Sequence, residues 1–233
     1  MTSTTFSSPA TRAASRRTVD APTRVMHWLM ALSFLGAYLT ADGERWRLLH
    51  VTLGYTLAGL LSFRMVWGLV GGRWSRFSSF LYPPGAVLAY LRGERRPEYS
   101  AGHSPLGALS VFALLLVLMA QVAAGLFSDD EIAFAGPLTR YVSSATVSLA
   151  TRYHADVGKL ILIALVVLHV LAIFFYRWKK KEDLIRPMIL GDKSVPAAVT
   201  IESSRDDAVS RLLAAVLFLA CSGMVAWLVG LGG

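Results

Sequence analysis

The sequence predicts an all-α fold, an integral membrane helical bundle, on two observations. Hydrophobic residues make up 55% of the 233 residues and charged residues only 16%, with a mean hydropathy of +0.52, whereas soluble domains average about 25% charged residues. The apolar residues are also grouped into segments of about 17–25 residues with almost no charge, each long enough to cross a hydrocarbon core of about 30 Å as a helix. These segments lack the polar stripe of a soluble amphipathic helix.

Five transmembrane helices are predicted in this way. They cover Val25 to Ala41, His50 to Val70, Ser104 to Phe127, Tyr153 to Tyr176 and Leu212 to Gly230. Residues 1–20 are rich in Ser, Thr, Ala and Arg, which predicts a disordered N-terminus. Ser15-Arg16-Arg17 resembles a twin-arginine export signal, but no small-residue cleavage site follows the first apolar segment. We therefore expect a retained helix there and not a signal peptide.

The basic residues near the helix ends predict the orientation, because cytoplasmic loops carry an excess of Lys and Arg. They cluster before the first helix, between the second and third, and directly after the fourth, whereas the loop after the third helix carries Asp129, Asp130 and Glu131. The sequence thus predicts a multi-pass protein of the bacterial inner membrane, in contact with membrane lipid, with a cytoplasmic N-terminus and a periplasmic C-terminus. The net charge of +8 comes from the basic residues that set this orientation. Because these residues form short clusters next to the membrane, they do not favour a nucleic-acid partner.

The candidate functional residues are five histidines, because an ionisable side chain inside a membrane helix is costly and suggests a site. They are His27, His50, His103, His154 and His169. His154 and His169 are fifteen residues apart on one helix, which places them about 22 Å apart along its axis and within about 60° of each other. His50 opens the second helix at the depth of His154, and His27 opens the first helix at the depth of His169. Depth therefore predicts the pairs His50/His154 and His27/His169.

Two imidazoles that face each other across a helix bundle are what a haem with two axial histidines needs. Such a six-coordinate iron transfers electrons and has no vacant position for substrate. Zinc and copper sites need three or four ligands at one point, whereas these four histidines separate into two pairs. For any one histidine alone, a hydrogen-bonded residue at a helix end is the better interpretation. The four positions together favour two haems.

Several other residues carry two readings. Arg24 and Arg47 precede His27 and His50 and could bind haem propionates, although topology explains Arg24 and interfacial solvation explains Arg47. The glycines of the apolar segments could make room for a porphyrin or allow close helix packing. His103 could have a structural role at a helix start, or exchange protons with a quinone. Cys221, the single cysteine, is expected to be a packing residue.

Short motifs resemble the bacterial cytochrome b561 family and its relatives, the b-type cytochrome subunits of nickel-iron hydrogenases. The motifs are Ala21–Trp28, Leu49–Tyr55, Gly102–Gly107, the histidine motifs of the fourth helix and Glu182–Met188. The resemblance spans Thr18 to Lys193 and implies a four-helix haem-binding core, two haems b and exchange of electrons with quinone. It implies the same four ligands: His27, His50, His154 and His169. The fifth helix, beyond Arg211, departs from the small four-helix members and favours the hydrogenase-type branch or a partner-binding role.

The resulting organisation is a disordered N-terminus (1–20), a cytochrome b561-like haem-binding domain of four transmembrane helices (21–193), and a cytoplasmic linker with a fifth helix (194–233). The expected function is electron transfer between the quinone pool and a redox partner protein, a c-type cytochrome or a dehydrogenase or hydrogenase subunit, in a respiratory chain. An electron-transfer subunit is expected in preference to a stand-alone enzyme. Two alternatives remain: a quinone-linked oxidoreductase acting on a small molecule such as superoxide, and a haem-free membrane anchor or transporter.

Overall fold

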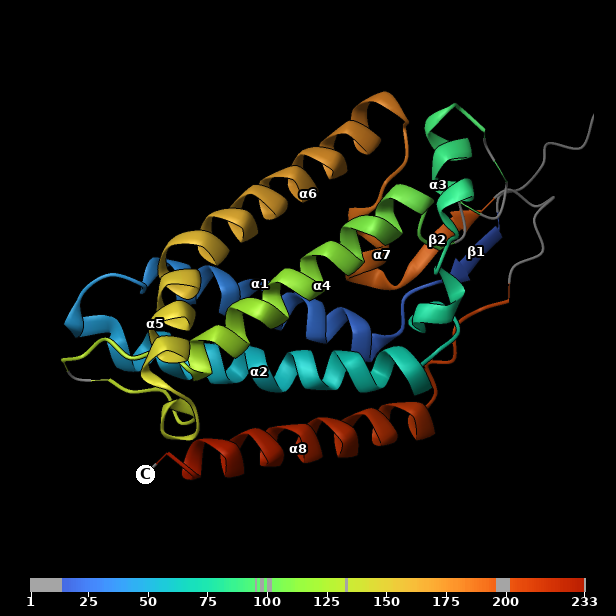
Figure 1. Ribbon diagram of the computed structural model, residues 1–233. Coiled ribbons are helices and arrows are strands. Elements are labelled where there is room, and N and C mark those ends of the chain that lie inside the picture. The colour runs from blue at the N-terminus through green and yellow to red at the C-terminus, as the bar shows by residue number, and fades with distance from the viewer. Residues whose placement is uncertain are drawn as a thin grey trace, which may run out of the picture.

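The chain is a bundle of long helices (Figure 1). The computed structural model describes residues 14–94, 96, 99, 102–132, 134–195 and 202–232. The elements are β1 (Ala14–Arg17), α1 (Ala21–Leu39), η1 (Glu44–Trp46), α2 (Arg47–Val70), η2 (Phe77–Ser79), α3 (Pro84–Leu91), α4 (Pro105–Leu126), η4 (Thr139–Tyr141), α5 (Ser144–Arg152), the π-helical segment η5 (Tyr153–Gly158), α6 (Lys159–Lys179), α7 (Ile185–Leu190), β2 (Asp192–Val195) and α8 (Ala208–Gly230). We call the end of the bundle where α1 begins the proximal end, and the end where α1 finishes and α2 begins the distal end.

Four helical stretches of the described chain are long and apolar enough to cross a membrane. They are Glu44–Val70, Pro105–Leu126, Ser144–Lys179 and Ala208–Gly230. These stretches coincide with the second to the fifth predicted spans to within one residue or contain them, which supports a multi-pass membrane protein. Helix α1 has 19 residues and covers the first predicted span up to Leu39, but it is not one of the four. The total of five transmembrane helices therefore stays a prediction.

The fourth predicted span is part of a longer helix than expected. Helices α5 and α6 run through η5 as one stretch of 36 residues that begins at Ser144 and not at Tyr153. Ser143 caps it, because its side chain accepts a hydrogen bond from the Thr146 amide. The added turns are polar and escape a search for apolar segments. At 1.5 Å per residue, a helix of this length spans about 54 Å and must project beyond a hydrocarbon core of about 30 Å.

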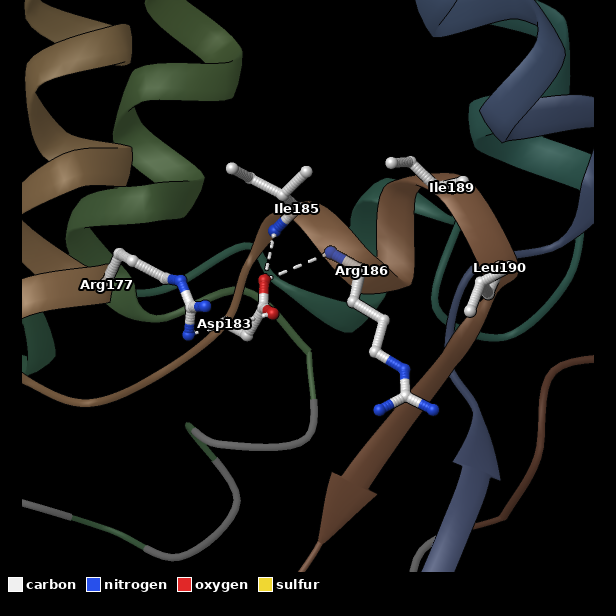
Figure 2. Close-up of a pocket in the computed structure, with 6 residues that line it drawn as sticks. All are labelled: Arg177, Asp183, Ile185, Arg186, Ile189 and Leu190. Carbon is white, nitrogen blue, oxygen red and sulfur yellow. Dashed lines mark hydrogen bonds and ion pairs between the residues drawn. The ribbon is translucent and has the colours of Figure 1, made fainter.

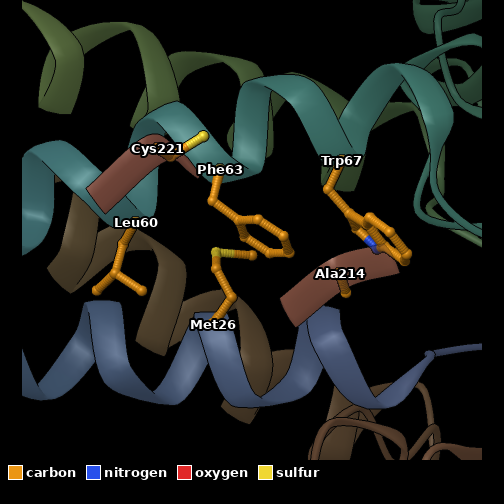
Figure 3. Packing of buried hydrophobic residues seen from close by; sticks show 6 residues of the cluster. All are labelled: Met26, Leu60, Phe63, Trp67, Ala214 and Cys221. Atoms are coloured by element: carbon orange, nitrogen blue, oxygen red, sulfur yellow. The ribbon is translucent and has the colours of Figure 1, made fainter. Parts of the chain in front are cut away.

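Helix α8 packs along α2, far from it in sequence (Figure 1). The contact is an apolar cluster in which Met26 of α1, Leu60, Phe63 and Trp67 of α2 and two α8 residues meet (Figure 3). One of the α8 residues is Cys221, which confirms its predicted packing role. A second cluster joins α2 to α4 and α6 through Leu57, Leu61, Leu115, Leu118 and Leu162. Helix α2 is therefore covered on two faces, by α8 and by α4.

Beyond the bundle, the N-terminal segment pairs with a segment that follows α7. Strand β1 forms an antiparallel ladder with β2 from Ala14↔Val195 to Arg17↔Asp192. The expected disorder up to residue 20 is thus wrong for residues 14–20, because backbone pairing compensates for their low hydrophobicity; residues 1–13 lie outside the described chain. Next to the ladder, Asp206 has a side chain only 4% exposed and contacts Arg17 at 2.6 Å and Arg211 at 2.8 Å. These ion pairs attach the start of α8 to β1.

Loss of the Asp206 carboxylate is expected to destabilise the protein in a pH-dependent way. Burial alone would raise the pKa of Asp206, but hydrogen bonds from Arg211 and Arg17 outweigh it and lower the pKa to about 2. The ionised carboxylate therefore stabilises the folded protein at pH values above its unfolded pKa of about 4, by about 2 kcal/mol. This stabilisation is lost as the pH falls towards 2. We expect Asp206→Asn to unfold earlier than the wild-type protein at neutral pH, with the difference shrinking below about pH 4.

Thermal unfolding of both proteins in detergent, across this pH range, measures the difference. The control is Glu44→Gln, which removes an 80% exposed carboxylate from its pair with Arg47 and should change stability by less than about 1 kcal/mol. A difference between Asp206→Asn and wild type that stays constant down to pH 2 would contradict the assignment.

Candidate functional site

His50 and His154 face each other at the distal end of the bundle. His50 lies in the first turn of α2, and His154 lies in η5. Their ring centroids are 6.0 Å apart and the ring planes are perpendicular. A histidine nitrogen binds a transition metal at about 2 Å, so two imidazoles on opposite sides of one metal ion have centroids about 6 Å apart. The pair predicted from depth is therefore brought together at a spacing that suits one metal ion between the rings.

Backbone carbonyls orient both rings of this pair. His50 Nδ1 lies 2.8 Å from the Ala37 carbonyl oxygen, and His154 Nδ1 lies 2.8 Å from the Gln121 carbonyl oxygen. A carbonyl only accepts, so Nδ1 must donate its hydrogen in each case, which leaves Nε2 of both rings unprotonated and able to bind metal. Gln121 adds a second contact, since its Nε2 donates to the His154 carbonyl at 2.8 Å.

The local backbone explains the orientation of the His154 side chain. A π-helical turn is a rare irregularity that recurs at functional sites, because it changes the direction of a side chain within a continuous helix. The ring of His154 then lies against the backbone of α4. A Cβ atom at Gly125 would come within 2.9 Å of His154 Cε1 and 3.2 Å of Nδ1, so only glycine leaves space for this ring.

We expect Gly125→Ala to weaken binding at this pair. The added methyl group displaces the imidazole of His154 and stretches its hydrogen bond to the Gln121 carbonyl. Loss of such a supporting contact typically lowers metal affinity by about 10- to 100-fold. The control is Gly223→Ala in α8, where a Cβ atom meets nothing within 4 Å. Cofactor content of the two purified proteins measures the effect, and equal content would contradict the steric argument.

His27 and His169 are the second predicted pair, near the proximal end. His27 lies in the second turn of α1 and His169 in α6, and the two interact electrostatically. His27 Nδ1 is shielded from solvent and has no hydrogen-bond partner among the described residues. The neighbouring Trp28 ring stands perpendicular to His27 at 5.3 Å and donates from Nε1 to the Met188 carbonyl. A buried ring nitrogen without a partner fits a site that is completed by a further group.

The two arginines predicted to contact haem propionates both have carboxylate partners. Arg24 donates from Nη1 to the Ile189 carbonyl at 2.9 Å and lies 3.8 Å from Asp206. Arg47 lies 3.3 Å from Asp130 and 3.8 Å from Glu44. Arg24 shares Asp206 with Arg17 and Arg211, and its Nε has no hydrogen-bond partner among the described residues. Propionate contact by either arginine stays a prediction.

His103 lies at the entrance to α4, packed against Phe80 with ring centroids 4.5 Å apart. Burial lowers the pKa of His103 to about 4, and the charges of Arg64 and Lys193 add to this effect. The ring is therefore neutral at physiological pH. Because little of His103 is protonated, exchange of protons between His103 and a quinone is disfavoured. A structural role at the start of α4 is favoured instead.

Asp20 and Arg64 are polar residues of the proximal end that the sequence reasoning missed. Asp20 is fully buried and accepts hydrogen bonds from the Thr23 amide, Ser75 Oγ and Trp67 Nε1. Arg64 is 5% exposed within α2. An arginine inside the apolar segment from His50 to Val70 was a visible signal, because intramembrane charges mark functional sites by default.

Two surface clefts are found among the described residues. One, of about 360 Å³, lies between the end of α6 and α7 (Figure 2). It is lined by Arg177, Asp183, Ile185, Arg186, Ile189 and Leu190. The other, of about 270 Å³, includes Asp129 and Thr151 at the distal end. None of the four predicted ligands lines either cleft. Within the described residues, no three or more His, Cys, Asp or Glu side chains gather as a metal site.

The model of a known protein family, described as prokaryotic cytochrome b561, matches residues 18–191. The chain belongs to the prokaryotic cytochrome b561 family. Family membership makes it a membrane b-type cytochrome of electron transport, so haem b is the cofactor that the site must fit. The match covers α1 to α7 and ends before α8, so the apolar contact with α2 attaches a helix from outside the matched region.

Curated relatives of this cytochrome b561 carry hydrogenase names. It is 33% identical over 126 residues to the probable Ni/Fe-hydrogenase B-type cytochrome subunit of Azotobacter vinelandii, covering 42% of this chain and 52% of the relative. It is 28% identical over 154 residues to the probable Ni/Fe-hydrogenase 1 B-type cytochrome subunit of Escherichia coli K12, covering 53% and 65%. The matched part thus spans about half the length of the Azotobacter relative. No solved structure matches the chain.

The residues of this cytochrome b561 fit haem b. Two histidines face each other at 6.0 Å with both Nδ1 atoms bonded to carbonyls, which suits axial ligation by Nε2. Space adjoins one of them, because a Cβ atom at Gly54, one turn after His50, meets nothing within 4 Å. At the proximal end the unpartnered Nδ1 of His27 is compatible with a second such group.

Proposed function

We propose that this chain is a di-haem b-type cytochrome that transfers electrons between the quinone pool and a redox partner protein. The observation that carries the proposal is the geometry of His50 and His154, whose rings are 6.0 Å apart and are both oriented through Nδ1. His27 and His169, which interact electrostatically, are the proposed second pair at the proximal end. The chain therefore offers two axial pairs, one near each end of the bundle.

Each part of the chain has a defined task in this proposal. Haem b supplies a reversible one-electron iron couple. His50 with His154, and His27 with His169, would each hold one haem iron, and iron with two histidine ligands would have no coordination position for oxygen or substrate. Apolar side chains between α2, α4 and α6 exclude water, which lowers the local dielectric constant and reduces the screening of charge. Two sites at different depths would carry charge across most of the low-dielectric layer.

The electron partner follows from the named relatives and from charge. Relatives called hydrogenase cytochrome subunits make a hydrogenase subunit our preferred partner, with a c-type cytochrome or another dehydrogenase subunit as alternatives. The basic residues at the proximal end support a cytoplasmic location for that end in a bacterial inner membrane, with the C-terminus in the periplasm. Quinone in the membrane is the proposed second redox partner.

An optical spectrum of the purified protein tests the proposal. We expect the reduced-minus-oxidised difference spectrum to be of the low-spin b type, and pyridine haemochrome quantification to give about two haems per chain. Reduction by a quinol should then be measured with and without a candidate hydrogenase subunit. Turnover of superoxide by the protein alone would favour the stand-alone oxidoreductase. Protein without haem, made under haem-replete conditions, would favour an anchor or transporter.

A further inference from the structure

Arg64 is a buried charge whose hydrogen-bonding capacity is mostly unused. Its guanidinium donates from Nη1 to the Ser75 carbonyl at 3.1 Å and lies over the Phe77 ring at 4.5 Å. An arginine has five N–H donors, and no carboxylate of the described residues lies within ion-pair distance of this one. Arg24 and Arg47, by contrast, both have carboxylate partners. A charge in the interior is costly unless an opposite charge and hydrogen bonds compensate it.

The helix packing places Arg64 at the depth of the proximal histidine pair. Met26, which precedes His27, packs against Leu60, Phe63 and Trp67 of α2 (Figure 3). Arg64 lies within this stretch of α2, so it is level with His27. Both residues are therefore at the same height in the bundle, far from the distal pair: Arg64 follows His50 by fourteen residues, which is about 21 Å along the helix.

Arg64 also faces the interior of the bundle and not α8. Leu57 and Leu61 lie two turns and one turn before it on the same face of α2, and both belong to the cluster shared with α4 and α6. Phe77, which contacts the Arg64 guanidinium, packs on this same cluster. Phe63 and Trp67, which lie about 100° and about 60° around the helix from Arg64, pack against α8. The charge thus points into the space enclosed by the helices that carry the histidines.

A second polar atom in this region also lacks a partner. His103 Nδ1 is shielded from solvent and has no hydrogen-bond partner among the described residues, and His103 interacts electrostatically with Arg64. The nearby carboxylate that influences Arg64 is Asp20, which already accepts three hydrogen bonds from other groups. Asp20 therefore does not pair with Arg64, and an anion bound in the proximal interior would balance the Arg64 charge.

We propose that Arg64 binds a propionate carboxylate of the haem whose axial ligands are His27 and His169, an inference that rests on the proposed di-haem function. The planar guanidinium matches a carboxylate through two parallel hydrogen bonds, which a point charge does not provide. A propionate turned towards Arg64 supplies an acceptor and balances the buried charge. Arg64 is a positioning residue here, because it contacts the edge of the haem and not the iron.

The midpoint potentials of the two haems, titrated with optical detection at several pH values, test this assignment. A nearby cation favours the ferrous iron over the more positive ferric iron, so Arg64→Gln should lower one of the two potentials at alkaline pH and leave the other unchanged. Without Arg64 the buried propionate should also be protonated more readily. The same potential should then rise more steeply than that of the wild-type protein as the pH falls.

The matched control is Arg177→Gln, which removes an exposed cation from the same end of the bundle and should shift neither potential, since solvent and salt screen it. Arg64→Lys keeps the charge without the planar fork and is expected to give an intermediate potential. If Arg64→Gln does not fold, the rate of haem transfer to apomyoglobin is compared between Arg64→Lys and the wild-type protein. Faster transfer of one haem from Arg64→Lys supports the assignment, and an unchanged rate overturns it.

The outcomes separate this inference from the proposed function. A wild-type protein with fewer than two haems defeats the di-haem proposal before Arg64 is tested. A wild-type protein with two haems, and an Arg64→Gln protein with both potentials and their pH dependence unchanged, leaves the di-haem proposal intact and shows that Arg64 only attaches the loop after α2 through Ser75.

Discussion

Replacing His154 with alanine should remove one haem and leave the other. His154 provides one axial nitrogen of the distal pair, and its alanine variant leaves His50 with no partner across the bundle. A haem bound through a single histidine has lost half of its axial coordination. We therefore expect haem content to fall from about two per chain to about one, with the remaining haem still low-spin.

Double variants test which histidines share a site. His50→Ala should give the same loss as His154→Ala, and the two substitutions together should cause no further loss, because they empty one site. His154→Ala combined with His169→Ala should instead abolish haem binding. Cys221→Ala, a change in the buried contact between α2 and α8, is the control and should retain both haems. An additive loss for His50 and His154 would show that they do not ligate the same iron.

Replacing Asp20 with alanine is expected to produce the largest loss of stability. The carboxylate caps α1 at the Thr23 amide and accepts from Ser75 Oγ at 2.6 Å and Trp67 Nε1 at 3.3 Å. Each buried donor left without an acceptor costs about 1–3 kcal/mol, and the lost helix cap costs about 1 kcal/mol. We expect a destabilisation of about 3–5 kcal/mol in total.

The midpoint of urea unfolding in mild detergent measures this effect. Asp207→Ala is the matched control, because Asp207 also caps a helix, α8, but is exposed and bonds only locally to Ser210 and Arg205. Its loss should be much smaller. Similar midpoints for the two variants would mean that Asp20 acts as a helix cap alone, and that its contacts with α2 and the following loop contribute little.

The sequence by itself determined the helical membrane class, the family and the depth of the histidines. Hydrophobic segment length reports membrane spans, and the rise of a helix is constant, so the fifteen-residue spacing of His154 and His169 places them near opposite ends of the bundle. The same local rules located α2, α4, α6 and α8. They did not reveal α5, whose polar turns resemble a loop when only hydrophobicity is considered.

Only the tertiary structure decided how these groups are oriented and supported. The orientation of the His154 side chain depends on η5 and on the carbonyl of Gln121, which is 33 positions away in sequence. The links between Asp20 and Ser75 and between Arg17 and Asp206 join residues 55 and 189 positions apart. The periodicity of apolar residues shows which face of a helix is apolar. It does not show which residues from distant parts of the chain contact that face. Those partners are set by packing of the whole chain, because a buried donor or charge is stable only where the fold supplies its acceptor.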